Sequence, residues 1–182
     1  MPAWNHWYHV TSNTYGTWLP GDPRGWRERG HKKHVDGDYK SPPPPGCGDA
    51  QHRRSRGLLV KPPVHLDIAQ REIAGRAVVE MLFQQTIEVL TVSLGAVHLH
   101  ILARFPDAQV RPKVGRAKKH ACFTLRDDGF RGRLWETGSG VVPIADRQHQ
   151  LNVFAYIVRH GEEGAWVWTF REGLYWKKSE DV

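Results

Sequence analysis

Residues 87–105 read IEVLTVSLGAVHLHILARF, two apolar runs rich in β-branched residues that meet at Gly95. Runs of this kind are typical of β-strands, so we expect one strand over 87–94 and another over 96–105. A glycine between two strands permits a tight turn. The stretch is therefore predicted to form a hairpin.

The second strand of this hairpin carries two histidines, His98 and His100. Residues two apart on a strand point to the same face, so both imidazoles project together while Leu99 and Ile101 point to the other side. With 11 histidines among 182 residues, the spacing can arise by chance. The position of the pair inside an apolar strand is stronger evidence for a site, because burying polar groups there is costly unless they have hydrogen-bond or ligand partners. Two adjacent imidazoles make half of a divalent-metal site.

The other predicted elements follow from residue patterning. They are a strand over 4–15, a helix over 64–86 that starts near Pro62-Pro63, a helix over 111–126, a strand over 132–144 with a glycine break, and a helix over 147–161. Asp146 is the expected N-cap of the last helix and Gly161 its end. This order predicts an α+β fold with a ferredoxin-like (βαββαβ) antiparallel sheet and helices on one face, plus an extra C-terminal helix. The second face of the sheet is expected to be free for a ligand.

The length predicts a single domain over 1–182. Residues 17–60 form a basic, Pro/Gly-rich insertion within it, including a run of four prolines at 42–45. We expect this insertion to be a loop rather than a core element. Residues 165–182 form a C-terminal tail that the pattern does not assign.

The charge balance is basic, with 26 Lys and Arg against 19 Asp and Glu, a net charge of +7. An anionic partner is expected, with nucleic acid as the default. For each basic residue proposed to contact phosphate, the alternative interpretation is a solvated surface charge. These candidates are Arg53, Arg54, Arg104, Lys113, Arg116, Lys118, Lys119, Arg126 and Arg159. No apolar run reaches the ~18 residues of a membrane span, and neither a secretory signal nor a cysteine pattern is present, so a cytoplasmic protein is expected.

The last predicted helix carries Tyr156 and His160, four residues apart and therefore on one helical face. A tyrosine hydroxyl can act as a covalent nucleophile. His160 could complete a three-ligand metal site with the histidine pair, leaving open positions as catalytic sites require. The alternatives are a surface tyrosine and a histidine that interacts with the negative end of the helix dipole.

The pattern of His98-Leu99-His100 followed by Tyr156 and His160 resembles the HUH motif and tyrosine helix of the single-tyrosine HUH transposases. The resemblance is strongest to insertion-sequence and REP-associated tyrosine transposases. Residues 7–12 and 134–136 are similar to strand segments of the REP-associated members. His160 stands where insertion-sequence members often have glutamine, no Asn-Pro follows the tyrosine, and the 17–60 insertion lies outside the pattern.

This resemblance implies a metal-dependent single-strand DNA endonuclease and strand transferase. Tyr156 would form a 5′-phosphotyrosine, and His98, His100 and His160 would hold Mg²⁺ or Mn²⁺. The implied substrate is single-stranded DNA with hairpin structure, and the implied assembly is a monomer or a homodimer. Two alternatives remain open: a non-catalytic nucleic-acid-binding module or inactive relative, with Trp7 or Tyr8 stacking on bases, and a phosphodiesterase that uses activated water.

Overall fold

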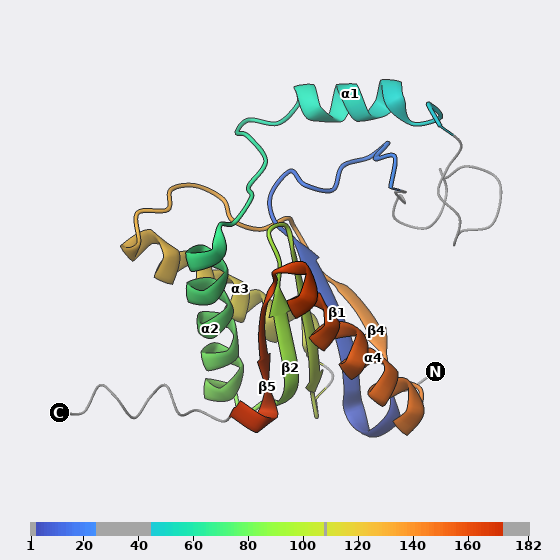
Figure 1. Cartoon of the computed structure of the whole chain (residues 1–182), viewed down its shortest axis with the longest axis vertical. Helices are drawn as coiled ribbons and strands as arrows, with labels where there is room; N and C mark the ends of the chain where they lie inside the picture. The colour runs from blue at the N-terminus through green and yellow to red at the C-terminus, as the bar shows by residue number, and fades with distance from the viewer. Residues whose placement is uncertain (1–2, 25–44, 108, 173–182) are drawn as a thin grey trace.

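A computed structural model describes residues 3–24, 45–107 and 109–172 of the chain. In this part, five antiparallel strands form one sheet in the order β4-β1-β3-β2-β5 (Figure 1). The strands are β1 (Trp7–Asn13), β2 (Glu88–Leu94), β3 (His98–Arg104), β4 (Gly140–Pro143) and β5 (Trp166–Thr169). The helices are α1 (Asp49–Gly57), α2 (Ile68–Gln84), α3 (Val110–Asp127) and α4 (Arg147–Arg159), with short 3-10 turns at η1 (Trp4–His6), η2 (His160–Glu163) and η3 (Phe170–Glu172). The predicted α+β class and antiparallel sheet are confirmed.

The predicted hairpin forms the centre of the sheet. β2 and β3 pair antiparallel, and the amide of Gly95 donates to the carbonyl of His98 at 2.9 Å to close the turn. β1 pairs with the other edge of β3, with Asn13 opposite His98. The two histidines therefore lie on a central strand with a neighbouring strand on each side.

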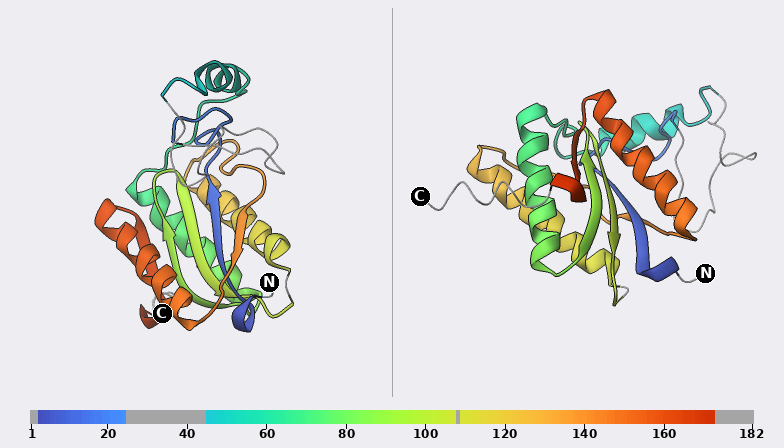
Figure 2. Two further views of the ribbon diagram at one scale, coloured as in Figure 1. Left: turned by 90° about the vertical axis from the view of Figure 1, so that its right-hand side faces the viewer. Right: turned by 60° about the horizontal axis from the view of Figure 1, so that its bottom comes forward.

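The two faces of β3 bury different sets of residues. Leu99, Ile101 and Ala103 belong to the main hydrophobic core beneath α2 and α3. Leu102 belongs to a smaller cluster with Val153 and Ile157 of α4. The sheet thus separates α2 and α3 from α4 (Figure 2). His98 and His100 share the face of Leu102, as the two-residue period predicts.

α4, the extra C-terminal helix, contradicts the expectation that the second face of the sheet is free. It packs across β2 and β3 on the face opposite α2 and α3, because its apolar stripe needs a surface to cover. Its start is as predicted: the Asp146 carboxylate accepts from the amide of His149 at 2.7 Å. Its end is not at Gly161. The helix gives way to η2, and Gly164 holds the left-handed conformation at φ 81°.

α2 starts at a capping box rather than at the proline pair. The Asp67 side chain accepts from the amide of Gln70, and the Gln70 side chain accepts from the amide of Asp67. Near its middle, Gly75 lies against Trp166 of β5, and a Cβ at Gly75 would meet the indole at 2.1 Å. This close approach fixes β5 against α2.

Three further elements differ from the expectation. The insertion, described over 17–24 and 45–60, contains the helix α1, which buries none of its residues and so shows no apolar periodicity. The strand predicted over 132–144 is limited to β4, and Trp135 makes only an isolated bridge to Thr14. Part of the unassigned tail forms β5, an edge strand paired with β2, whose Trp168 is buried. None of the helices in the described ranges is long and apolar enough to cross a bilayer.

Candidate active site

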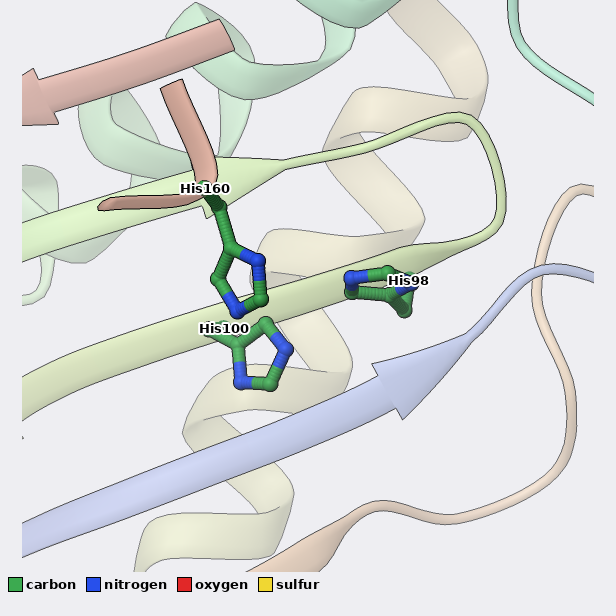
Figure 3. A group of neighbouring side chains, drawn as sticks. All are labelled: His98, His100 and His160. Carbon is green, nitrogen blue, oxygen red and sulfur yellow. The ribbon is translucent and has the colours of Figure 1, made fainter. Parts of the chain in front are cut away.

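Three histidines from two elements converge on one side of the sheet. His98 and His100 project from β3, and His160 reaches them from the turn that follows α4 (Figure 3). One ring nitrogen of each lies within 4.8 Å of the others. The rings of His100 and His160 stack with centroids 4.7 Å apart. The predicted ligand set is therefore brought together.

The two nitrogens of His160 have different surroundings. Nδ1 lies 3.2 Å from a carboxylate oxygen of Glu163. Nε2 is buried and has no hydrogen-bond partner anywhere in the described part of the chain. A buried nitrogen without a partner costs roughly 1–3 kcal/mol, and a metal ion would satisfy it. The residues present therefore fit a metal ion.

His100 is held by a fourth histidine, His9 of β1. Nδ1 of His100 lies 3.0 Å from Nε2 of His9, and the two rings stack with centroids 5.3 Å apart. The shared hydrogen bond leaves Nε2 of His100 as the nitrogen that can serve as a ligand. Partners of this kind fix the tautomer and orientation of ligating histidines. Sequence reasoning missed both His9 and Glu163.

Burial keeps these imidazoles neutral. Burial first, and then repulsion from neighbouring histidines, lowers the pKa of His100 from 6.5 to about 3 and that of His9 to about 4. The pKa of His98 is also lowered, first by burial and then by repulsion from His160. Neutral imidazoles offer the lone pair that a metal ion needs, so no proton has to leave at neutral pH.

The donor set bears on which ion would fit. Imidazole nitrogen suits Zn²⁺, Fe²⁺, Ni²⁺ and Cu²⁺, whereas Mg²⁺ prefers oxygen donors. Two nitrogens bound at ~2.1 Å cannot be more than ~4.2 Å apart, and the three ligand atoms here all lie within 4.8 Å of one another, close to the spacing of a loaded site. An ion of the Mg²⁺ or Mn²⁺ kind would need oxygens from water or phosphate to complete its shell.

Tyr156 lies directly beside the histidines, in the same chain. Its ring centroid is 4.8 Å from that of His160, 5.5 Å from that of His100 and 6.2 Å from that of His9. Its position one helical turn before His160 explains the first of these distances. The side chain is 41% exposed, so the phenol is accessible from solution.

Most of the predicted basic contacts lie elsewhere. α3 runs on the opposite face of the sheet, behind β3 in Figure 3. This helix carries Lys113, Arg116, Lys118, Lys119 and Arg126. Lys113 pairs with Asp107, and the Arg116 guanidinium donates to Gln85. A DNA strand that crosses the histidine face would not meet these side chains.

Lys118 is a buried ammonium rather than a surface charge. Its Nζ donates to Ser12 Oγ at 2.7 Å and to the carbonyls of Glu136 and Gly138 at 3.1 and 2.6 Å. All three of its hydrogens are therefore used inside the protein. Burial lowers its pKa from 10.5 to about 8. It ties α3 to β1 and to the segment before β4, which leaves no donor for a phosphate.

The remaining basic candidates are exposed but scattered. Arg104 lies at the far end of β3 from the histidines and pairs with Glu88. Arg53 and Arg54 lie on the exposed surface of α1. Arg159 is exposed and directly precedes His160, so it is the predicted phosphate contact nearest to the histidine group.

The comparisons with known proteins find similar chains among the solved structures but none by sequence. No protein-family model matches the chain, and no curated protein matches it in sequence. A solved structure of a REP-associated tyrosine transposase bound to a REP hairpin is similar, with 10% identity over 88% of this chain and 68% of that chain, at a TM-score of 0.48. At this identity and TM-score, the match transfers no activity or residue role to this chain.

Proposed function

We propose that this protein is a metal-dependent nicking and rejoining enzyme for single-stranded DNA. The observation that carries the proposal is the position of Tyr156 at the edge of the three-histidine group, with an accessible phenol. A nucleophile beside a set of ligands with open positions is what phosphoryl transfer through a covalent intermediate requires.

In the proposed reaction, the Tyr156 oxygen attacks the phosphorus of the scissile phosphate. The bond from the tyrosine oxygen to phosphorus forms, the bond from phosphorus to the 3′ oxygen breaks, and the 3′ oxygen leaves with a proton. The 5′ phosphate stays on the tyrosine, so the energy of the diester is retained and a 3′ hydroxyl can reverse the step. No nucleotide cofactor is needed.

His98, His100 and His160 would hold the ion, with His9 and Glu163 orienting two of them. A bound divalent ion supplies positive charge at a non-bridging phosphate oxygen. The helix α4 sets the distance between nucleophile and ligands, because Tyr156 lies on it and His160 directly follows it.

We also propose that the fold is ferredoxin-like, with α1, α4 and β5 as additions. The strand order β4-β1-β3-β2 and the element order support this, since they match the βαββαβ pattern. The proposed substrate is a single strand next to a hairpin, as the sequence resemblance implies.

The test is a covalent-adduct assay with labelled stem-loop single strands, with and without Mn²⁺. Wild type and Tyr8→Phe are expected to form a 5′ adduct, and Tyr156→Phe is expected to form none. Tyr8 is a matched control because it packs against the main core, on the other face of the sheet. An adduct in Tyr156→Phe would show that the nucleophile is wrongly assigned. Cleavage without an adduct would favour activated water, and binding without cleavage would favour a non-catalytic module.

A further inference from the structure

A pocket of about 440 Å³ has walls that include none of the histidines of the candidate site. Its walls come from the segment that follows β1, from Leu59 shortly after α1, and from the segment that precedes β4. Two aromatic rings, Tyr15 and Trp18, line it together with Arg133 and Glu136. The pocket thus combines flat apolar surfaces with one cation and one carboxylate.

Both rings are held in place by guanidinium groups. The Arg24 guanidinium lies 4.8 Å from the centroid of the Trp18 ring, and Asp22 fixes that arginine through an ion pair at 2.6 Å. The Arg133 guanidinium lies 5.3 Å from the centroid of the Tyr15 ring, and its Nε donates to the carbonyl of Trp135 at 2.9 Å. Rings fixed in this way lose little conformational entropy when a flat ligand stacks on them.

Glu136 provides the polar group of the pocket. Its side chain is partly buried, and one carboxylate oxygen accepts from Asn13 Nδ2 at 3.2 Å. That is the only hydrogen bond to the carboxylate from residues in the described ranges. Burial raises the pKa of Glu136, while the Asn13 hydrogen bond opposes this shift. The group therefore retains capacity to accept hydrogen bonds from a ligand.

A single residue, Asn13, connects the pocket to the proposed metal ligands. Asn13, which holds Glu136, is the cross-strand partner of His98, and side chains of directly paired residues have Cβ atoms roughly 5 Å apart. A strand bound across the histidines would place a neighbouring nucleotide at this pocket.

We propose that the pocket binds one unpaired nucleobase next to the scissile phosphate and that it selects a base with an exocyclic amino group. Tyr15 and Trp18 supply stacking surfaces, which tolerate any base. Glu136 supplies the selection, because a carboxylate accepts from the amino groups of cytosine, adenine or guanine. Thymine has no amino group, and its one base-edge donor, the N3–H, lies between two carbonyl oxygens, which repel the carboxylate. The inference rests on the proposed function and names a base-selecting site within it.

The test uses the Tyr156→Phe protein, which binds without cleaving, and fluorescence anisotropy with labelled twelve-nucleotide strands. The strands are all thymine or carry a single central cytosine, adenine or guanine. We expect at least one amino-bearing strand to bind about tenfold more tightly than the all-thymine strand. Adding Glu136→Gln is expected to reduce this ratio to below about threefold, because a glutamine amide can pair with thymine as well.

Adding Trp18→Ala is expected to weaken binding of the preferred strand about tenfold. Glu162→Gln and Phe170→Ala are the matched controls, since both side chains are exposed and lie outside the pocket. Equal affinity for all four strands, or an unchanged ratio in Glu136→Gln, would overturn the proposal. Binding is measured in a protein without the nucleophile, so the two proposals fail separately. Base selection that depends on Glu136, with no adduct in wild type, would contradict only the proposed function. An adduct in wild type, with no base selection, would contradict only the base-selecting pocket.

Discussion

Glu163 and His9 are the residues that give the histidine group its orientation. Each contacts Nδ1 of a ligand, of His160 in the case of Glu163 and of His100 in the case of His9. Such contacts keep a ligand ring in one tautomer and raise its basicity. The Glu163 side chain is 70% exposed, and an exposed pair of this kind adds little to folding stability. Its removal is therefore expected to affect the metal more than the fold.

Glu163→Gln is predicted to weaken the affinity for Mn²⁺ about tenfold or more, in line with other outer-shell carboxylates. Titration calorimetry of the full chain measures this without any activity. Glu162→Gln removes the same charge from the neighbouring position, where the side chain is exposed, and is expected to leave the affinity unchanged. Equal losses in both variants would mean that charge, not orientation, is responsible.

The metal-free protein is predicted to lose stability as the pH falls below about 6.5. Folded His9 and His100 take up protons only near pH 4 and pH 3, whereas the unfolded chain takes them up near 6.5. Unfolding therefore binds protons in this window, and the free energy of unfolding falls as the pH falls. For each such histidine, the loss is at most about 1.4 kcal/mol per pH unit. Urea unfolding with a chelator, between pH 7 and pH 4.5, measures this slope.

His9→Asn removes one of the two groups with a strongly lowered pKa, so it is expected to show a shallower slope than wild type over the same pH range. Asparagine can still hydrogen-bond Nδ1 of His100 but does not titrate. Identical slopes in the two proteins would contradict the assignment of this pH dependence to His9.

Among single elements, the features that depend only on residues close in sequence were predicted correctly. The hairpin, the shared face of His98 and His100 and the Asp146 cap all depend on residues close in sequence, and all three are present. The sequence did not predict which face of the sheet α4 covers. The stripe of Val153 and Ile157 shows that the helix has a buried side, but it does not show against which face.

The missed features depend on distant residues or on weak patterns. His9 meets His100 through the register of β1 against β3, which residue types alone do not encode. Glu163 lies in the 3-10 turn η2, beyond the predicted end of the helix at Gly161. α1 has no apolar stripe because it buries nothing. The basic residues of α3 predicted a phosphate surface, but charge on a helix does not show which side of the molecule that helix faces.

Gly75→Ala is predicted to destabilise the protein by about 1–3 kcal/mol, because a methyl group there overlaps the indole of Trp166. Gly115→Ala is the matched change. It lies in the middle of α3 with nothing within 4 Å of the added carbon, so it should stabilise by up to about 1 kcal/mol through helix propensity. Urea denaturation compares the two. Stabilisation by Gly75→Ala would contradict the packing of β5 on α2.

At the scale of the described molecule, most of the predicted basic contacts lie away from the histidine group. Five of the predicted contacts lie on α3, on the opposite face of the sheet, whereas Arg159 is exposed beside His160. Single-strand binding is therefore expected to depend on Arg159 more than on the α3 surface.

Arg159→Gln is predicted to weaken single-strand binding and to reduce the slope of log affinity against log salt by about 0.7, the value for one phosphate contact. Lys119→Gln on α3 is expected to change neither. Anisotropy titrations over a range of salt concentrations measure both quantities. A larger effect from Lys119→Gln would place the DNA on the other face of the sheet.

The central claim is that Tyr156 carries the DNA covalently. Wild-type protein is incubated with a single-stranded stem-loop and Mn²⁺, the DNA is digested to nucleotides, and the protein is cleaved with trypsin for mass spectrometry. Peptide 148–159 contains a single tyrosine, Tyr156. We predict that this peptide carries a 5′-phosphate-linked nucleotide and that it is unmodified without metal. A nucleotide on another tyrosine, or cleaved DNA with every tyrosine free, would contradict the claim.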